Sequence, residues 1–268
     1  YGYHRNLPSF PTRRSSDLRY FYMSADNFVA NLVNNFSAET IIKVDEKSKD
    51  RNTDNLYFLR VNSFLNDSNT ITGLQSVQQD INFFENNRAY SIRLRFLQQK
   101  GFNQYSSGNE RLSFIQKSAL FKLGLTDDIG LQLEYINKLD KNLAPPNSVR
   151  NRDISSDAVN TDISYKPIPQ IESGFEFKLS RATDYYPVQF IKADINQQIL
   201  RFIYSFAQVG RIRVEFERDE VIFNNSVLTF PYELTQGKVE GKSWFWRLFF
   251  DYSLSKNIQI SINYDGRS

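Results

Sequence analysis

The chain has 268 residues, of which 33 are basic and 30 are acidic, and 15% are aromatic; it contains one histidine and no cysteine. Without cysteine, thiol nucleophiles and cysteine-ligated zinc sites are excluded. No run approaches the ~18 apolar residues that a transmembrane helix needs, so a membrane protein of this sequence would have to be a β-barrel.

The first 18 residues look foreign to the rest of the chain. Residues 10–18 read FPTRRSSDL, which resembles a translated sequencing-adapter oligonucleotide; a native disordered arm is the alternative. We expect residues 1–18 to have no fixed structure and the native protein to start near Leu18 or Arg19, without its own N-terminus. Setting them aside leaves 30 basic and 29 acidic residues and no histidine. That balance removes the support for nucleic-acid binding and excludes histidine-based catalytic, zinc and haem sites.

Residues 19–37 form a lead-in before the regular part of the chain. Within it, residues 24–36 (SADNFVANLVNNF) place apolar side chains at helical spacing behind Ser24, a candidate N-cap. This spacing fits a short amphipathic helix. An irregular lead-in is an equal alternative.

From residue 38 to residue 268 the period of apolar residues becomes two, as expected for strands with one apolar side. YSIRLRF (90–96) and IQISINYD (258–265) are clear examples, and WFWRLFFDYSL (244–254) is the longest. The sequence predicts an all-β fold of about twelve strands, near 38–46, 56–65, 76–84, 89–98, 111–125, 130–139, 160–166, 172–181, 197–207, 210–222, 243–254 and 258–265.

The predicted connections alternate in length. Tight turns are expected at 85–88, 126–129, 168–170, 208–210 and 255–257, and long polar loops at 99–110, 140–159, 182–196 and 223–242. In an up-and-down antiparallel meander every second connection lies at the same end of the sheet. Alternation therefore favours a meander over a Greek-key sandwich.

This pattern resembles bacterial outer-membrane β-barrels over about residues 38–265: strands of roughly ten residues, short turns at one end, longer loops at the other, and aromatic residues near strand ends. The final block, from Tyr232 to Ser268, also resembles the closing region of large, uncharacterised envelope proteins. Such barrels commonly end on an aromatic residue, whereas this chain ends in DGRS, so we expect truncation at both ends.

The length of the longest stripe agrees with this resemblance. From Trp244 to Leu254, ~3.3 Å per residue and a tilt of ~40° give a height of about 25 Å, close to an outer-membrane apolar band.

The resemblance implies an orientation for each face of the sheet. The apolar face would meet lipid, and the charged face would line a hydrated lumen. The expected lipid-facing residues are Tyr90, Ile92, Leu94, Phe96, Phe175, Phe177, Ile212, Val214, Phe216, Trp244, Trp246, Leu248, Phe250, Tyr252, Ile258, Ile260 and Ile262. The expected lumen-facing charges are Arg93, Arg95, Glu134, Glu176, Lys178, Arg201, Arg211, Arg213, Glu215, Glu217, Arg247 and Asp251.

Three segments also resemble functional sites, but a structural role is favoured for each. Paired catalytic acids could be formed by Glu215, Glu217, Asp219 and Glu220. Glu215 and Glu217 share one strand face with flanking arginines, however, which favours a solvated charge ladder. DRNTDN (50–55) resembles a calcium loop without the glutamate at its twelfth position. Trp244 and Trp246 could stack on sugar, but their apolar stripe favours lipid or core contact. We expect no enzyme, no catalytic or metal site and no cofactor.

The sequence thus predicts a segment of an outer-membrane β-barrel acting as a channel, a secretion or assembly component, or a surface anchor. Its partners would be outer-membrane lipid and other envelope proteins or surface ligands that the long loops contact, and no nucleic acid. The alternative is a soluble extracellular or periplasmic β-sheet protein that binds a glycan or a protein.

Overall fold

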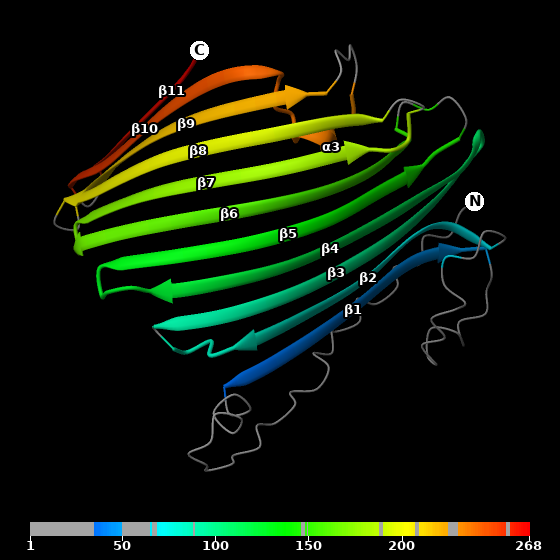
Figure 1. Ribbon diagram of the computed structural model, residues 1–268, viewed down its shortest axis with the longest axis horizontal. Coiled ribbons are helices and arrows are strands. Elements are labelled where there is room, and N and C mark those ends of the chain that lie inside the picture. Colours follow the sequence, from blue (N-terminus) through cyan, green and yellow to red (C-terminus); the bar gives the residue numbers. More distant parts are fainter. Residues whose placement is uncertain are drawn as a thin grey trace.

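The chain forms one curved antiparallel sheet of eleven strands in sequence order (Figure 1). The computed structural model describes residues 35–49, 65, 69–87, 89–145, 148, 150–187, 190–206, 209–224, 230–255 and 258–268. The strands are β1 (Phe36–Ser48), β2 (Thr70–Phe83), β3 (Tyr90–Tyr105), β4 (Gly108–Gly124), β5 (Ile129–Leu143), β6 (Arg152–Ile168), β7 (Ile171–Asp184), β8 (Ile191–Phe206), β9 (Gly210–Phe223), β10 (Gly241–Ser255) and β11 (Ile258–Arg267). The predicted all-β, up-and-down antiparallel fold is confirmed.

Some predicted segments lie outside the described residues. The predicted strand at 56–65 is one of them, apart from Leu65, which is in a turn. Residues 1–18 and the predicted helix at 24–36 also fall outside, except that Asn35 is a turn and Phe36 begins β1. The lead-in predicted to reach residue 37 therefore ends earlier.

The strands are longer than predicted at the end of the sheet where long loops were expected. Residues 99–110 are mostly β3 and β4, joined by a turn at 106–107, so the predicted long loop there is wrong. The loops predicted at 140–159 and 182–196 shrink to 144–151 and 185–190, whereas the connection between β9 and β10 remains long. At these strand ends polar side chains such as Lys100, Asp153 and Lys192 interrupt the apolar stripe, which in sequence is typical of loops. Their backbone pairing nevertheless continues, because a hydrogen-bonded ladder does not require an apolar face.

The strand register separates two faces of the sheet. Partners directly across a ladder point to the same face, so one row of apolar side chains crosses β6 to β10: Ile163, Phe175, Leu200, Phe216 and Trp246. The alternate residues of the same strands form the opposite face. We call these the apolar face and the polar face.

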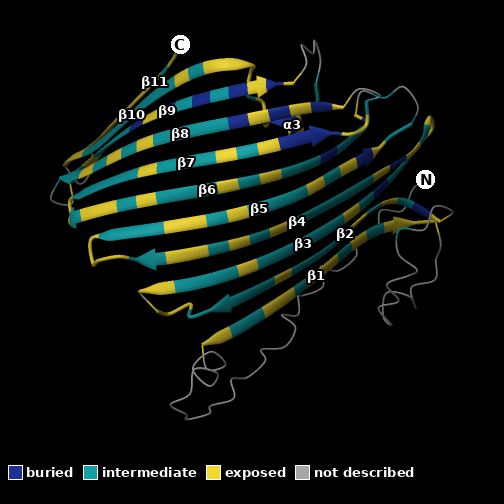
Figure 2. Cartoon of the chain, in the orientation of Figure 1, coloured by how far each residue is buried: buried dark blue, intermediate teal, exposed yellow. Residues whose placement is uncertain are grey.

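The buried residues gather near one end of β7, β8 and β9 (Figure 2). There the short helix α3 (Tyr232–Thr235) contacts β7 and β8. Its Leu234 is 1% exposed and packs in an apolar cluster with residues of β6 to β9. The cluster is formed by Ile154, Ala182, Ile191, Ala193, Ile195, Val221, Phe223 and Leu234. A fold with so small a core depends mainly on its ladders and on what covers its faces.

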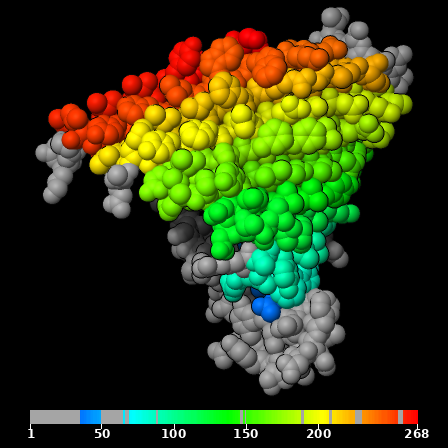
Figure 3. Space-filling view, turned by 60° about the vertical axis from the view of Figure 1, so that its left-hand side comes forward, coloured from blue at the N-terminus to red at the C-terminus, as the bar shows by residue number. Residues whose placement is uncertain are grey.

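The space-filling view shows the strands side by side in sequence order, from the C-terminal strands at the top to the N-terminal ones below (Figure 3). Among the described residues, no helix is long and apolar enough to cross a membrane.

Candidate functional site: a charged face opposite an exposed apolar face

The apolar face carries large side chains that no part of the described chain covers. Leu200 and Phe216 are each 52% exposed, Trp244 is 49% exposed and Ile262 is 51% exposed. Exposed side chains of this kind occur on this face on every strand from β1 to β11 except β2. Monomeric soluble proteins seldom expose a contiguous apolar patch above about 600 Å². This face therefore requires an apolar partner or solvent.

On β7, β8 and β10 the apolar band stops before the strand does, whereas exposed Leu143 and Ile222 continue it towards the ends of β5 and β9. Beyond it, on the same face, Arg181 of β7 pairs with Asp194 of β8 at 2.7 Å, and Lys242 of β10 lies 3.4 Å from Glu220 of β9. At the opposite boundary, near the short turns, tyrosines lie on the apolar face of β3, β6, β8 and β10: Tyr90, Tyr165, Tyr204 and Tyr252. A band bordered by charges on one side and by tyrosines on the other is amphipathic along the strand axis.

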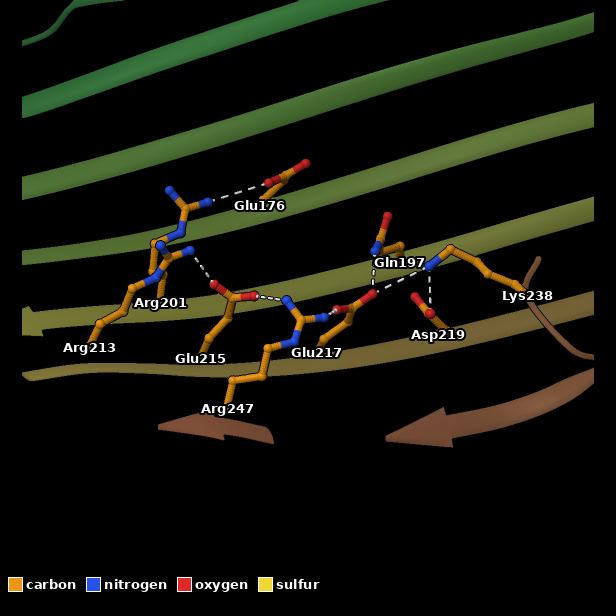
Figure 4. A network of polar contacts seen from close by, with 9 residues as sticks. All are labelled: Glu176, Gln197, Arg201, Arg213, Glu215, Glu217, Asp219, Lys238 and Arg247. Atoms are coloured by element: carbon orange, nitrogen blue, oxygen red, sulfur yellow. Dashed lines mark hydrogen bonds and ion pairs between the residues drawn. The ribbon is translucent and has the colours of Figure 1, made fainter. Parts of the chain in front are cut away.

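The polar face holds a chain of charges that alternates in sign along β9 and β10 (Figure 4). Arg247 Nη1 donates to Glu215 at 2.5 Å, and its Nη2 donates to Glu217. Arg213 Nη2 also donates to Glu215, at 2.6 Å. Glu217 further accepts from Gln197 Nε2 at 2.5 Å. The three strands β8, β9 and β10 thus place these groups together because their polar residues alternate in register.

The network ends at Lys238, which comes from the connection between β9 and β10. Its Nζ donates to Asp219 Oδ2 at 2.5 Å and to Glu217 Oε1 at 3.4 Å. Glu217 and Asp219 are 7% and 4% exposed, so each needs a cationic partner. One lysine from outside the sheet therefore balances charges that the strands alone would leave in excess.

Energetically, the buried members of this network matter more than the exposed ones. Removing one partner of a buried ion pair costs about 3–5 kcal/mol, because a desolvated charge is left behind. Exposed pairs, such as Arg211 with Asp251 at 3.9 Å, contribute about 0–1 kcal/mol. The network around Glu215 and Glu217 therefore fixes side-chain positions on the polar face.

A second, smaller network lies on the polar face of β2 and β3. Arg95 makes a two-pronged contact with Asp80, with Nε to Oδ1 at 2.7 Å and Nη2 to Oδ2 at 3.1 Å. Arg93 Nε donates to Asn82 at 2.9 Å. Arg201 and Glu176 form a third pair at 3.5 Å between β8 and β7. Mixed charge thus extends across the polar face.

The structure places the two predicted sets on opposite faces. All twelve charges expected to face a lumen share the polar face by register, and the seventeen residues expected to face lipid share the apolar face. That these faces meet water and lipid stays a prediction. Leu254, the last residue of the predicted stripe, lies where the β10–β11 register shifts, so the regular alternation stops at Ser253.

The predicted lumen-facing set left out five of the residues in these networks: Asp80, Asn82, Gln197, Asp219 and Lys238. Strand parity could have placed the first four, because each occupies the polar-face position of its strand. Lys238 carries no such signal, since its position depends on how a non-repetitive segment folds back. The resemblance to a calcium loop at 50–55 lies outside the described residues.

Comparison with known proteins does not assign the chain to a family. No family model matches it, and no curated protein matches it. Among solved structures, it is similar to the translocator domain of the autotransporter NalP from Neisseria meningitidis, with 8% sequence identity, 74% of each chain covered and a TM-score of 0.30. At that TM-score the likeness carries no argument about this chain.

Proposed function

We propose that this chain is part of an outer-membrane β-barrel, acting as a channel, a secretion or assembly component, or a surface anchor. The proposal rests on the uncovered apolar face, which has large exposed apolar side chains on every described strand except β2 and is bordered along the strand axis by charges and tyrosines. A bilayer matches such a band without any further protein layer.

In this function the two faces have different roles. The apolar face contacts the acyl chains, while the paired charges of the polar face border a hydrated interior and give it a mixed electrostatic lining. The strand ends beyond the apolar band project past the membrane, where they and their connections can contact envelope proteins or surface ligands. The action is passive, and the chain needs no cofactor for it.

Single cysteines test the proposal, since the chain has none of its own. Leu248→Cys lies in the middle of the apolar stripe of β10, and Arg213→Cys lies on the polar face of β9. In lipid vesicles, a membrane-partitioning thiol reagent should label position 248 and a charged maleimide should not; position 213 should show the reverse preference.

A soluble protein gives a different result. If a second protein layer covers the apolar face, position 248 reacts with neither reagent while position 213 reacts freely with both. If the lipid-phase reagent fails to label position 248 in protein shown to be folded, the barrel is excluded.

A further inference from the structure

The polar face is not polar throughout. At the end of the sheet where β9 leads into its long connection, β6 to β9 place seven apolar residues on this face, including Ala182 at 2% and Val221 at 1% exposure. This buried apolar patch has no partner within the sheet. It must be covered by something else, because water contact with it is unfavourable.

The cover is residues 230–240, which we call the strap. Phe230 packs against Phe223 of β9 with ring centroids 4.7 Å apart and ring planes tilted by 41°. Leu234 of α3 then enters the apolar patch, and Glu233 reaches Arg152 of β6 at 3.1 Å. The strap therefore starts after β9, crosses the polar face as far as β6, and returns to β10.

Beyond α3 the strap turns back sharply and is held a second time. Gln236 and Gly237 both have left-handed backbone angles, with φ of 58° and 81°. This reversal brings Lys238 to Asp219 at 2.5 Å and to Glu217 at 3.4 Å (Figure 4). The strap is thus fixed by one apolar anchor and one ionic anchor on different strands.

The fit between strap and sheet is close. The cavity that remains beneath it, lined by Lys178, Gln197 and Leu234 among others, has a volume of about 20 Å³. This is room for about one water molecule. Residues on the polar face beneath the strap are consequently shielded from bulk solvent.

We propose that the strap is a latched cover that closes this end of the polar face, with Leu234 and Lys238 as its two latches. Releasing both latches uncovers the apolar patch and removes a positive charge from beside Glu217 and Asp219. Closure of a water-filled passage by this cover rests on the proposed function, whereas the attachment of the strap by Leu234 and Lys238 does not.

Cysteine accessibility tests the latch in the full chain, in detergent or in lipid. Ala182→Cys puts a thiol beneath the strap, and Asn263→Cys puts one on the polar face of β11, where it is exposed. A water-soluble maleimide should label position 263 quickly and position 182 slowly. In the background of Leu234→Asp with Lys238→Gln, labelling at 182 should become at least about tenfold faster. The reason is that replacing one buried leucine already lowers the stability of the closed strap by more than the free energy of a tenfold change in an equilibrium constant. Labelling at 263 should not change.

Matched controls separate latch release from general loosening. Val239→Asp adds the same charge at an exposed strap position, and Lys242→Gln removes a lysine that pairs with Glu220 on the apolar face. Neither should expose position 182. If the double variant fails to fold, Lys238→Gln alone should still accelerate labelling at 182 relative to Lys242→Gln.

Rapid labelling of position 182 in the parent chain, or equal acceleration by the controls, would overturn the latch. If labelling follows the latch residues but ion conductance across a bilayer is the same with the strap released, the latch stands and the channel form of the proposed function fails.

Discussion

Replacing Leu248 by arginine measures directly whether the apolar face lies in a bilayer. Leu248 lies four residues from both Trp244 and Tyr252, the two ends of the regular apolar stripe on β10. Four steps of ~3.4 Å at a tilt of ~40° put it about 10 Å from either boundary, near the middle of the band. Arginine at such a depth costs about 2–4 kcal/mol in a transmembrane strand.

The matched control is Asn196→Arg. This position is on the same face, on β8, but at the edge of the apolar band, between Leu179 of β7 and Glu220 of β9. Near or outside the interface the cost of arginine falls to about 0–1 kcal/mol. The new guanidinium can also face the carboxylate of Glu220, so no destabilisation is expected.

The measurement is denaturant unfolding of each variant refolded into lipid vesicles of two acyl-chain lengths. For Leu248→Arg the loss in unfolding free energy should grow with chain length, because the guanidinium has farther to reach to water. A soluble sheet would also tolerate arginine poorly at this position, but its loss would not depend on the lipid. Equal losses of unfolding free energy at positions 248 and 196, or a loss at 248 that does not depend on bilayer thickness, would refute the reasoning.

Three further predictions concern stability and are read from thermal or denaturant unfolding. Arg247→Met should destabilise the chain by about 2–4 kcal/mol, less than the loss expected for a buried charge left with no partner, because other cations remain near Glu215 and Glu217. Adding Glu217→Gln should recover part of this loss, and full additivity of the two changes would show that the two residues do not interact. Gly210→Ala should destabilise it, since the added Cβ would lie 2.5 Å from a backbone oxygen of β10, whereas Gly174→Ala, with 3.8 Å to its nearest neighbour, should be close to neutral. Deleting residues 1–18 should leave the midpoint of unfolding unchanged, and a clear drop would mean that they belong to the fold.

The sequence predicted the elements of this fold that repeat with a period of two. In segments such as YSIRLRF, apolar and polar residues alternate, so both the strand and its two faces can be predicted from the order of the residues alone. The up-and-down order of the strands was predicted from the alternation of short and long connections. Where those conditions held, as in β9 to β11, predicted and observed ranges differ by few residues.

What could not be predicted depends on backbone pairing and on distant contacts. The outer part of β3 is mostly polar on both faces, and in β8 the apolar residues Ile191, Ala193 and Ile195 lie on the face opposite the apolar stripe, so neither segment continues the pattern that marks the rest of its strand. The position of Lys238 depends on the left-handed turn at Gln236 and on Leu234 finding the apolar patch. No periodic pattern in the sequence encodes either event.

The up-and-down order of the described strands has a consequence for how the sheet can be joined into a ring. Strand direction reverses at every step, so with eleven strands β1 and β11 point the same way. A direct seam between them would be parallel, with slanted and evenly spaced hydrogen bonds, unlike every other junction in the sheet. An antiparallel seam needs an odd number of additional strands between them. The parity of the strand count, rather than any side chain, therefore determines the geometry of closure: a parallel seam completes a ring of eleven, and one inserted strand completes a ring of twelve.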